Sequence, residues 1–187
     1  MGYIVLIIGV LLWIAAHYFK RLMPDVRANM GDKGKGVVTA LIVVSLLAMI
    51  FGYRWAPFDP VWEPQPWLRT INNALMVVAF YVYGASAAKG AKVWLGTKLR
   101  HPQLTGFGIW AVAHLLVNGD LASLILFGGL LAWAIGSARL INAAEGAWVV
   151  PDQAPFKKEI VLLVITVVLF TIVSLLHTWA GVYPFGG

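Results

Sequence analysis

Residues 36–53 read GVVTALIVVSLLAMIFGY, a run without a charged side chain. An α-helix rises about 1.5 Å per residue and needs ~20 residues to cross a hydrocarbon core of ~30 Å, so this run is long enough to span a lipid bilayer. Its apolar residues do not alternate with polar ones, as the strands of a membrane-spanning barrel would require. The stretch therefore predicts a transmembrane α-helix.

Similar apolar runs follow one another along the rest of the chain, at 3–19, 71–88, 104–118, 121–138 and 159–180. Pro102 is well placed in the first turn of the helix expected at 104–118 and would extend it by about two residues. Asn118-Gly119-Asp120 is typical of a tight turn, so the helices on either side of it are expected to form a hairpin. The alternative, one uninterrupted helix, is too long for one span. These patterns predict an all-α protein with six transmembrane helices in one domain covering 1–187.

The composition supports a membrane protein and excludes several other classes. Apolar residues make up 60% of the chain and charged residues only 12%, against roughly 25% in an ordinary soluble domain. The chain contains no cysteine, which excludes a disulfide scaffold, a zinc ribbon and thiol chemistry. The net charge of +6 is expected to reflect basic loops at a membrane surface rather than a nucleic-acid partner.

The basic residues predict the orientation of the helices. Twelve of the 14 lysines and arginines fall in three alternate loops between the runs: Lys20, Arg21, Arg27, Lys33 and Lys35; Lys89, Lys92, Lys98 and Arg100; Arg139, Lys157 and Lys158. The positive-inside rule places these loops in the cytoplasm and both termini on the periplasmic side. No basic region precedes the run 3–19, so this run is expected to be a retained helix and not a cleaved signal peptide.

Few side chains in the apolar runs can carry chemistry, and four of them are histidines: His17, His101, His114 and His177. His114 is expected ~18 Å and His177 ~27 Å along its helix, and His101 precedes the helix start at Pro102. A buried imidazole needs a hydrogen bond or a metal to compensate its lost hydration. The residues alone leave open an interhelical hydrogen bond for His114 and an interfacial position for His17 and His177.

A metal centre is the other possibility for these histidines. Zinc and di-iron sites usually recruit several histidines or carboxylates, and no pair of carboxylates falls within an expected span. A porphyrin whose iron is bound by one or two histidines is therefore the metal centre that requires the fewest ligands from this sequence. Phe107, Trp110 and Asn118 share a helical face with His114, either as the wall of such a site or as ordinary packing.

The most distinctive motif lies around His114. The string RHP at 100–102 is followed by Gly106, by WAVAHLLVNGD at 110–120 and by LFG at 126–128. Together these residues closely resemble the NnrU family, and His17 with the following PDVR at 24–27 and Gly31 is similar to its first-span signature. The resemblance extends over nearly the whole chain.

The resemblance implies a multi-pass protein of the bacterial inner membrane that is linked to nitrite and nitric oxide reduction in denitrification. A distant relative with the same domain is the plant and cyanobacterial 15-cis-zeta-carotene isomerase, which binds haem b. The resemblance further implies haem b with His17 and His114 as axial ligands, and His101 matches another family histidine. The isomerase has a cysteine one helical turn before its fourth-span histidine, where this chain has Ala111, so a thiolate ligand is excluded here.

The candidate cofactor-binding residues are therefore His17, His114, His101, Trp110 and Asn118, with Arg27 and Arg100 as partners of the haem propionates. For the two arginines, charge that only orients the loops is the alternative. Three functions are open: a haem protein that serves nitrite and nitric oxide metabolism beside a nitrogen-oxide reductase; a haem-dependent cis-trans isomerase of a hydrophobic polyene; and a non-enzymatic membrane assembly factor. In each, the lipid bilayer is the expected surroundings of the chain.

Overall fold

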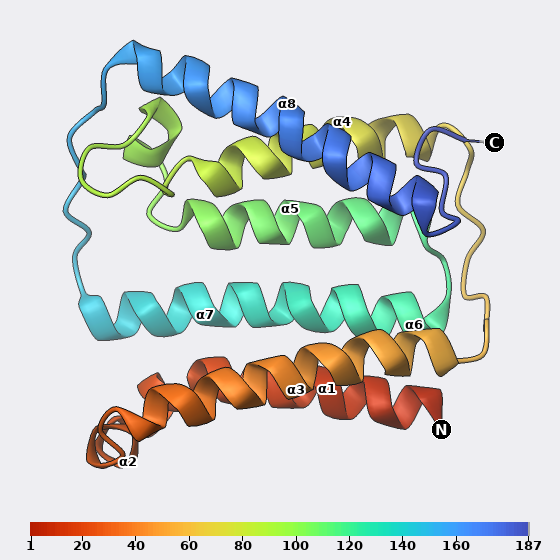
Figure 1. Ribbon diagram of the computed structural model, residues 1–187, viewed down its shortest axis with the longest axis horizontal. Helices are drawn as coiled ribbons and strands as arrows, with labels where there is room; N and C mark the ends of the chain where they lie inside the picture. The colour runs from red at the N-terminus through yellow and green to blue at the C-terminus, as the bar shows by residue number, and fades with distance from the viewer. Residues whose placement is uncertain (187) are drawn as a thin grey trace. The chain divides into compact units, whose positions relative to one another are not determined.

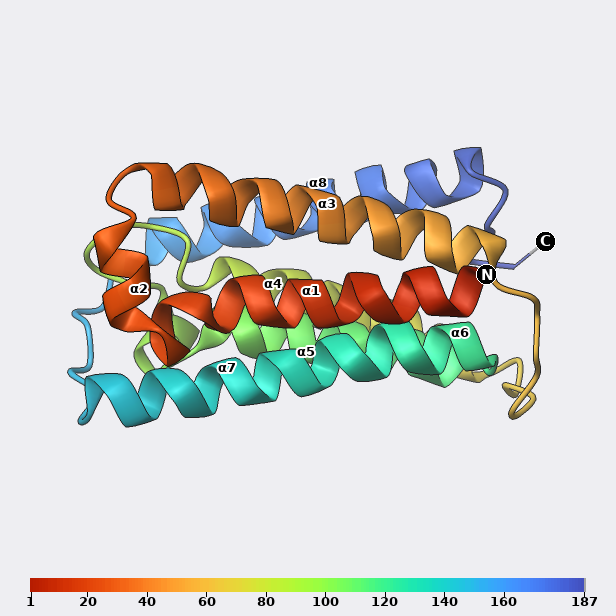
Figure 2. The same ribbon diagram turned by 90° about the horizontal axis from the view of Figure 1, so that it is seen from below.

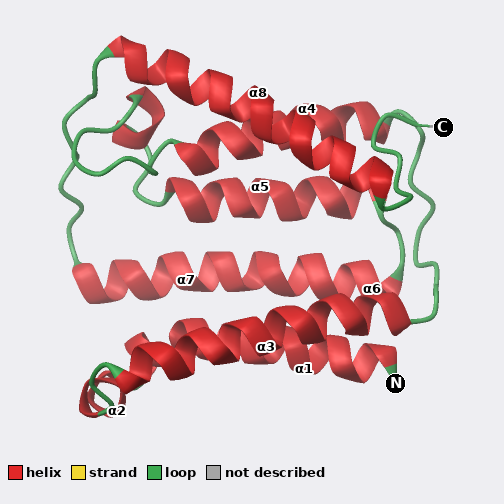
Figure 3. Ribbon diagram, in the orientation of Figure 1, coloured by secondary structure: helices red, strands yellow, loops and turns green. Residues whose placement is uncertain are grey.

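A computed structural model describes residues 1–186, which form helices, turns and loops without a β-strand (Figure 3). The all-α prediction is confirmed. The chain is divided into two compact units, each built from two separate segments. Unit 1 contains residues 1–63 and 118–146, and unit 2 contains residues 64–117 and the described part of 147–187.

Unit 1 consists of three long helices and a short connecting one. They are α1 (Gly2–Leu22), α2 (Pro24–Asn29), α3 (Lys33–Trp55) and a continuous helical segment made of α6 (Leu121–Ser123), the π-helical stretch η2 (Leu124–Gly128) and α7 (Gly129–Glu145). Helix α1 lies against α3 and α7, as Figures 1 and 2 show from two directions.

The backbones of α1 and α3 approach each other closely at glycine. A Cβ atom added to Gly52 would lie 2.4 Å from the backbone nitrogen of Leu6, and one added to Gly9 would lie 2.8 Å from that of Met49. Leu6 is fully buried in this contact, with 0% of its surface exposed. Small residues at a helix–helix contact permit the close packing that associates helices in lipid. The glycines therefore fix where these two helices meet.

The second segment of unit 1 is attached to the first by backbone hydrogen bonds. Val61 and Trp62 donate N–H groups to the carbonyl of Gly119, at 2.7 and 3.0 Å, and Leu121 donates to the carbonyl of Asp59 at 2.9 Å. Asp120 then caps the following helix, because its side chain accepts a hydrogen bond from the Ser123 N–H at 2.9 Å. The chain is thus held at the point where it re-enters the unit.

Unit 2 contains α4 (Leu68–Gly84), the 3-10 turn η1 (Trp94–Thr97), α5 (Pro102–Val117) and α8 (Phe156–Trp179). Helix α4 packs against both α5 and α8, and α4 and α5 run in opposite directions (Figure 1). A Cβ atom on Gly106 of α5 would lie 2.6 Å from the nitrogen of Tyr83 and 2.7 Å from the carbonyl oxygen of Ala79. This glycine therefore allows the backbones of α4 and α5 to approach closely.

The loop between α4 and α5 is hydrogen-bonded to the segment that precedes α8 and to the first turn of α8. The Glu159 carboxylate accepts hydrogen bonds from the Tyr81 hydroxyl and, at 3.1 Å, from the backbone N–H of Trp94. Lys92 donates its N–H to the Asp152 carbonyl at 2.8 Å, and the Lys92 carbonyl accepts from Ala154 at 2.6 Å. These bonds hold the loop that contains η1 in place.

Within residues 1–186, six helical segments of 16 residues or more occur where the apolar runs predict helices, and several ends agree closely. Pro102 is the first residue of α5, as predicted. Helix α5 ends at Val117 and α6 begins at Leu121, which excludes one uninterrupted helix. Within residues 1–186, four segments are long and apolar enough to cross a membrane: α1, α3, Leu121–Glu145 and α8. Helix α5, with 16 residues, and α4, with 17, are shorter.

Two predicted helix ends are wrong. The helix expected to reach residue 88 stops at Gly84, because the following residues form the turns that lead to η1 and Lys92 donates to the Ser86 carbonyl at 3.1 Å. The helix expected to end at 138 continues to Glu145, because isolated polar residues do not terminate it. It ends at Gly146, whose φ of 66° is favourable for glycine and whose N–H donates to the Asn142 carbonyl.

Candidate functional site

The four histidines are divided between the two units. His17 lies on α1 in unit 1, whereas His114 on α5 and His177 on α8 belong to unit 2. His101 immediately precedes α5, and its carbonyl accepts a hydrogen bond from the Thr105 N–H at 2.9 Å. The position of His101 at a helix start agrees with the sequence.

His17 is held by its own helix and lies among tryptophans. Its Nδ1 atom is 2.8 Å from the carbonyl oxygen of Trp13, one turn earlier. Because a carbonyl can only accept, Nδ1 carries the proton and Nε2 carries the lone pair. The imidazole centroid is 4.2 Å from the Trp13 ring and 4.8 Å from the Trp133 ring of α7. The ring is therefore both oriented and packed against aromatic faces.

Two further features define the surroundings of His17. The indole Nε1 of Trp13 is buried and finds no hydrogen-bond acceptor within residues 1–186. The neighbouring Tyr18 donates its hydroxyl to the Trp133 carbonyl at 3.0 Å, which links α1 to α7 beside the imidazole. A buried donor without an acceptor is uncommon in proteins, and a ligand atom is one means of satisfying it.

His114 repeats the arrangement of His17 on α5. Its Nδ1 atom is 2.9 Å from the carbonyl oxygen of Trp110, again one turn earlier. The Trp110 ring lies 5.0 Å from the imidazole, and Phe107 lies 4.9 Å from Trp110. The aromatic face predicted from helical spacing is confirmed for these two residues. Asn118, predicted on the same face, begins the second segment of unit 1.

His177 is the neighbour that sequence reasoning did not assign to His114. The two imidazole centroids are 6.5 Å apart, and the Nδ1 atom of His177 is 2.8 Å from the carbonyl of Val173. Distances along the runs suggested different depths for these residues. Both histidines lie close to the last residue of their helix. Three residues of α5 follow His114, and two residues of α8 follow His177, which is the better indication that the two rings are near each other.

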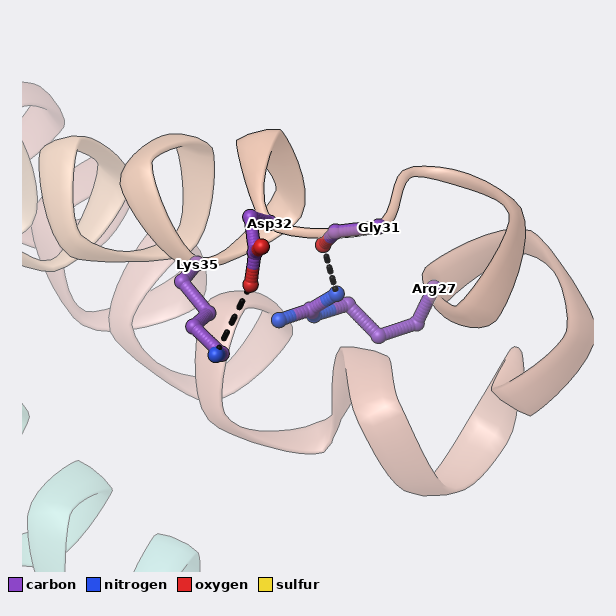
Figure 4. Close-up of polar contacts among 4 residues, drawn as sticks. All are labelled: Arg27, Gly31, Asp32 and Lys35. Atoms are coloured by element: carbon purple, nitrogen blue, oxygen red, sulfur yellow. Dashed lines mark hydrogen bonds and ion pairs between the residues drawn. The ribbon is translucent and has the colours of Figure 1, made fainter.

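The two candidate propionate partners are Arg27, in the last turn of α2, and Arg100, just before α5. Arg27 donates through Nη1 to the Gly31 carbonyl at 3.1 Å (Figure 4). Its guanidinium also lies close to Gly34. Lys35, in the first turn of α3, pairs with Asp32 at 2.9 Å. Arg27 therefore helps to close the connection between α2 and α3, and Arg100 lies in the turn before α5.

The available donors fit a porphyrin better than a metal centre built from many protein ligands. Within the described residues, no three His, Cys, Asp or Glu side chains come together to hold a metal ion. What the chain provides is imidazoles with a defined lone-pair nitrogen, each packed beside aromatic rings. Haem iron requires only one or two such ligands and apolar walls.

The comparison with protein families finds one family for the chain. The family model described as NnrU protein matches residues 5–184, which is nearly the whole chain and includes His17, His101, His114 and His177. No curated protein and no solved structure matches the chain.

Proposed function

The chain belongs to the NnrU family, and from this premise we propose that it is a haem b-binding protein of the bacterial inner membrane. In this proposal His17 and His114 are the axial ligands, and the protein supports nitrite and nitric oxide metabolism, acting with a nitrogen-oxide reductase. Haem held by these residues would supply a centre that changes redox state.

The observation that carries this proposal is the matching arrangement of two histidines on different helices. In both, Nδ1–H donates to the carbonyl four residues earlier, at 2.8 Å for His17 and 2.9 Å for His114. A hydrogen bond from the second ring nitrogen to a backbone carbonyl is the usual device that orients a metal-binding imidazole and keeps Nε2 available. The Trp13 and Trp110 rings, each beside its histidine, supply apolar walls.

The remaining family positions have supporting roles in the proposal. Arg27 and Arg100 pair with the propionates, since both belong to the basic connections between the apolar runs that are predicted to be cytoplasmic. His101 handles protons or orients a neighbouring group, and Asn118 contributes a polar contact. None of these roles requires a carboxylate in the bilayer, where an unpaired charge is costly.

The proposal includes six membrane crossings with both termini in the periplasm. It is supported by six helical segments in series and by the sequence, in which 12 of the 14 basic residues fall between alternate pairs of apolar runs. Helices α4 and α5 have 17 and 16 residues, at the short end of what a bilayer accepts. Snorkelling of flanking side chains and local thinning of the bilayer accommodate short spans.

The decisive experiment is an absorption spectrum of the protein purified in detergent from haem-replete cells, oxidised and reduced. We expect a Soret band that is lost or strongly shifted in both His17→Ala and His114→Ala, with partial recovery when imidazole is added. Gln153→Ala, at an exposed loop position, serves as the control and should leave the band unchanged. A wild-type protein without a Soret band would overturn the proposal.

A second readout separates haem chemistry from a purely structural role. The His17→Ala/His114→Ala double variant should fail to restore nitrite and nitric oxide reduction to cells that lack the protein. Full restoration, with normal protein amounts in the membrane, would instead indicate an assembly factor in which the histidines only pack helices.

A further inference from the structure

The chain turns back on itself after α8. Helix α8 ends at Trp179, and Gly181 follows with a φ of 84°, a conformation that glycine adopts readily. The N–H of Val182 then donates to the carbonyl of His177 at 2.9 Å. Residues 180–186, which we call the return segment, therefore fold back beside α8 (Figure 1).

Two contacts attach the return segment to the helices of unit 2. The ring of Phe185 lies 6.1 Å from the ring of Phe170, edge to face, and Phe170 is about 13.5 Å along α8 from its last residue. The Nδ2 atom of Asn73, in α4, donates to the carbonyl of Pro184 at 3.0 Å. The segment therefore extends from the end of α8 back to Phe170 and is also bound to α4.

The return segment lies on the face of α8 that contains His177. Four residues of α8 share this face, at spacings of four, four and seven: Leu162, Thr166, Phe170 and His177. The first two are buried, and Leu162 packs in a cluster with Ala85 after α4. The return segment leaves the helix at His177 and contacts it again at Phe170, so it covers the other half of the same face.

The amide that holds the return segment has a second acceptor beside it. Asn72 donates its Nδ2 to the Oδ1 atom of Asn73 at 3.1 Å, so the two amides and the Pro184 carbonyl form a chain of hydrogen bonds. This chain leaves the Oδ1 atom of Asn72 without a donor within residues 1–186, although Asn72 is only 9% exposed. A buried acceptor without a donor is unfavourable. When the return segment leaves, Asn73 is able to rotate and donate to Asn72, which satisfies that acceptor.

We propose that the return segment is a lid, latched by Asn73, that opens and closes over the His177 face of α8. The closed state has the bond to Pro184 and one unsatisfied amide oxygen, whereas the open state exchanges that bond for one between the two asparagines. Two arrangements with compensating hydrogen bonds are the usual basis of a conformational switch. The imidazole of His114 lies 6.5 Å from that of His177, so the lid controls access to both rings from the end of α8.

The test measures how fast diethyl pyrocarbonate modifies His177 in the full-length chain in lipid nanodiscs, by peptide mass spectrometry. Asn73→Ala removes the latch and should raise this rate by about threefold or more, the population shift that one net hydrogen bond controls. His17, in the other unit, is the internal reference and should keep its rate. Thr70→Ala, at an exposed position of α4, is the matched control and should react like the wild type.

Asn72→Ala separates the latch from general loosening of the helices. This variant removes the acceptor of the open state, so His177 should react no faster than in the wild type. A damaged α4 would instead raise the rate in both asparagine variants. Equal increases in Asn73→Ala and Asn72→Ala would therefore overturn the proposed latch.

A cross-link tests the lid without changing the asparagines. The chain contains no cysteine, so Phe170→Cys/Phe185→Cys provides one pair for a short bis-maleimide. The cross-linked chain should modify at His177 more slowly than the same variant without the reagent, and the cross-link should cancel the effect of Asn73→Ala. The proposal is overturned if the cross-link leaves the rate at His177 unchanged. No step involves haem, so these results do not depend on the proposed function.

Discussion

Asp120 illustrates how one residue holds a re-entrant chain segment. The carboxylate is only 7% exposed, and its oxygens accept from the Ser123 N–H at 2.9 Å and the Ser123 hydroxyl at 2.6 Å. The Ser123 Oγ atom also lies 2.8 Å from the Tyr53 hydroxyl of α3. The helix cap of α6 is thereby connected to a second helix of unit 1.

Replacing Asp120 with alanine should therefore destabilise unit 1. Loss of the cap and of the acceptor for buried Ser123 is expected to lower the free energy of unfolding by about 2 kcal/mol. Asp120→Asn keeps one acceptor oxygen and should lose less than half as much. Unfolding in detergent micelles, followed by circular dichroism, measures the difference. Asp152→Ala, at an exposed carboxylate, is the matched control, and equal losses in the two alanine variants would contradict the assignment.

Glu159 has the corresponding role in unit 2, where it accepts from both the Tyr81 hydroxyl and the Trp94 N–H. Hydrogen bonds to a charged acceptor contribute about 1.5–3 kcal/mol each when the acceptor is shielded from water. Glu159→Ala should release the loop that contains η1. The backbone amides of this loop should then exchange with solvent deuterium at least tenfold faster, as measured by mass spectrometry. Tyr81→Phe removes one of the two bonds and should give a smaller increase. Unchanged exchange at residues 92–97 in Glu159→Ala would contradict this role.

At the scale of elements, the glycines of α1 and α3 determine which helices pair. A Cβ atom on Gly52 would meet the Leu6 backbone at 2.4 Å, and backbone cannot move aside as a side chain can. Gly52→Val should force the two helices apart and lower the stability of unit 1 by about 1–3 kcal/mol or more. Gly36→Val, on the same helix but with open space around it, is the control. Thermal unfolding in detergent should show the loss for Gly52→Val alone.

Local chemistry explains which elements could be predicted from the sequence. The first residue of α5 follows from the fixed φ of Pro102, and the start of α6 follows from the cap at Asp120. The end of α4 at Gly84 could not be predicted, because the residues after it remain apolar and leave the helix to form the loop that binds Glu159 and Asp152.

The same reasoning explains what could be predicted of the candidate site. The Phe107–Trp110–His114 face follows from helical spacing alone. The proximity of His114 and His177 depends on how α5 and α8 pack with α4, which involves residues far apart in the chain. Periodicity within one helix carries no information about such a contact.

At the scale of the whole molecule, the distribution of charge and the order of the helices can be tested together. The chain contains no cysteine, so single cysteines can be introduced without a prior substitution. If six helices cross the membrane with both termini in the periplasm, exposed positions 28 and 153 lie in the cytoplasm, and exposed positions 65 and 183 lie in the periplasm. This arrangement follows from the positive-inside rule applied to the 12 basic residues that fall between alternate pairs of apolar runs.

We expect Gln65→Cys and Tyr183→Cys to react with a membrane-impermeant maleimide in cells whose outer membrane is permeabilised. Ala28→Cys and Gln153→Cys should react only after the inner membrane is disrupted. All four side chains are exposed, so a difference in labelling reports the side of the membrane and not burial within the protein.

If only the four longest helical segments crossed the membrane, α4 and α5 would not, and positions 65 and 28 would still lie on opposite sides because α3 separates them. Labelling at position 153 is the same for four and for six crossings, because α4 and α5 together return the chain to the side from which α4 starts. The pair Gln65→Cys and Ala87→Cys, two exposed positions on either side of α4, provides that distinction. Labelling of both from the periplasm would show that α4 does not cross, and labelling of position 65 alone would establish the crossing.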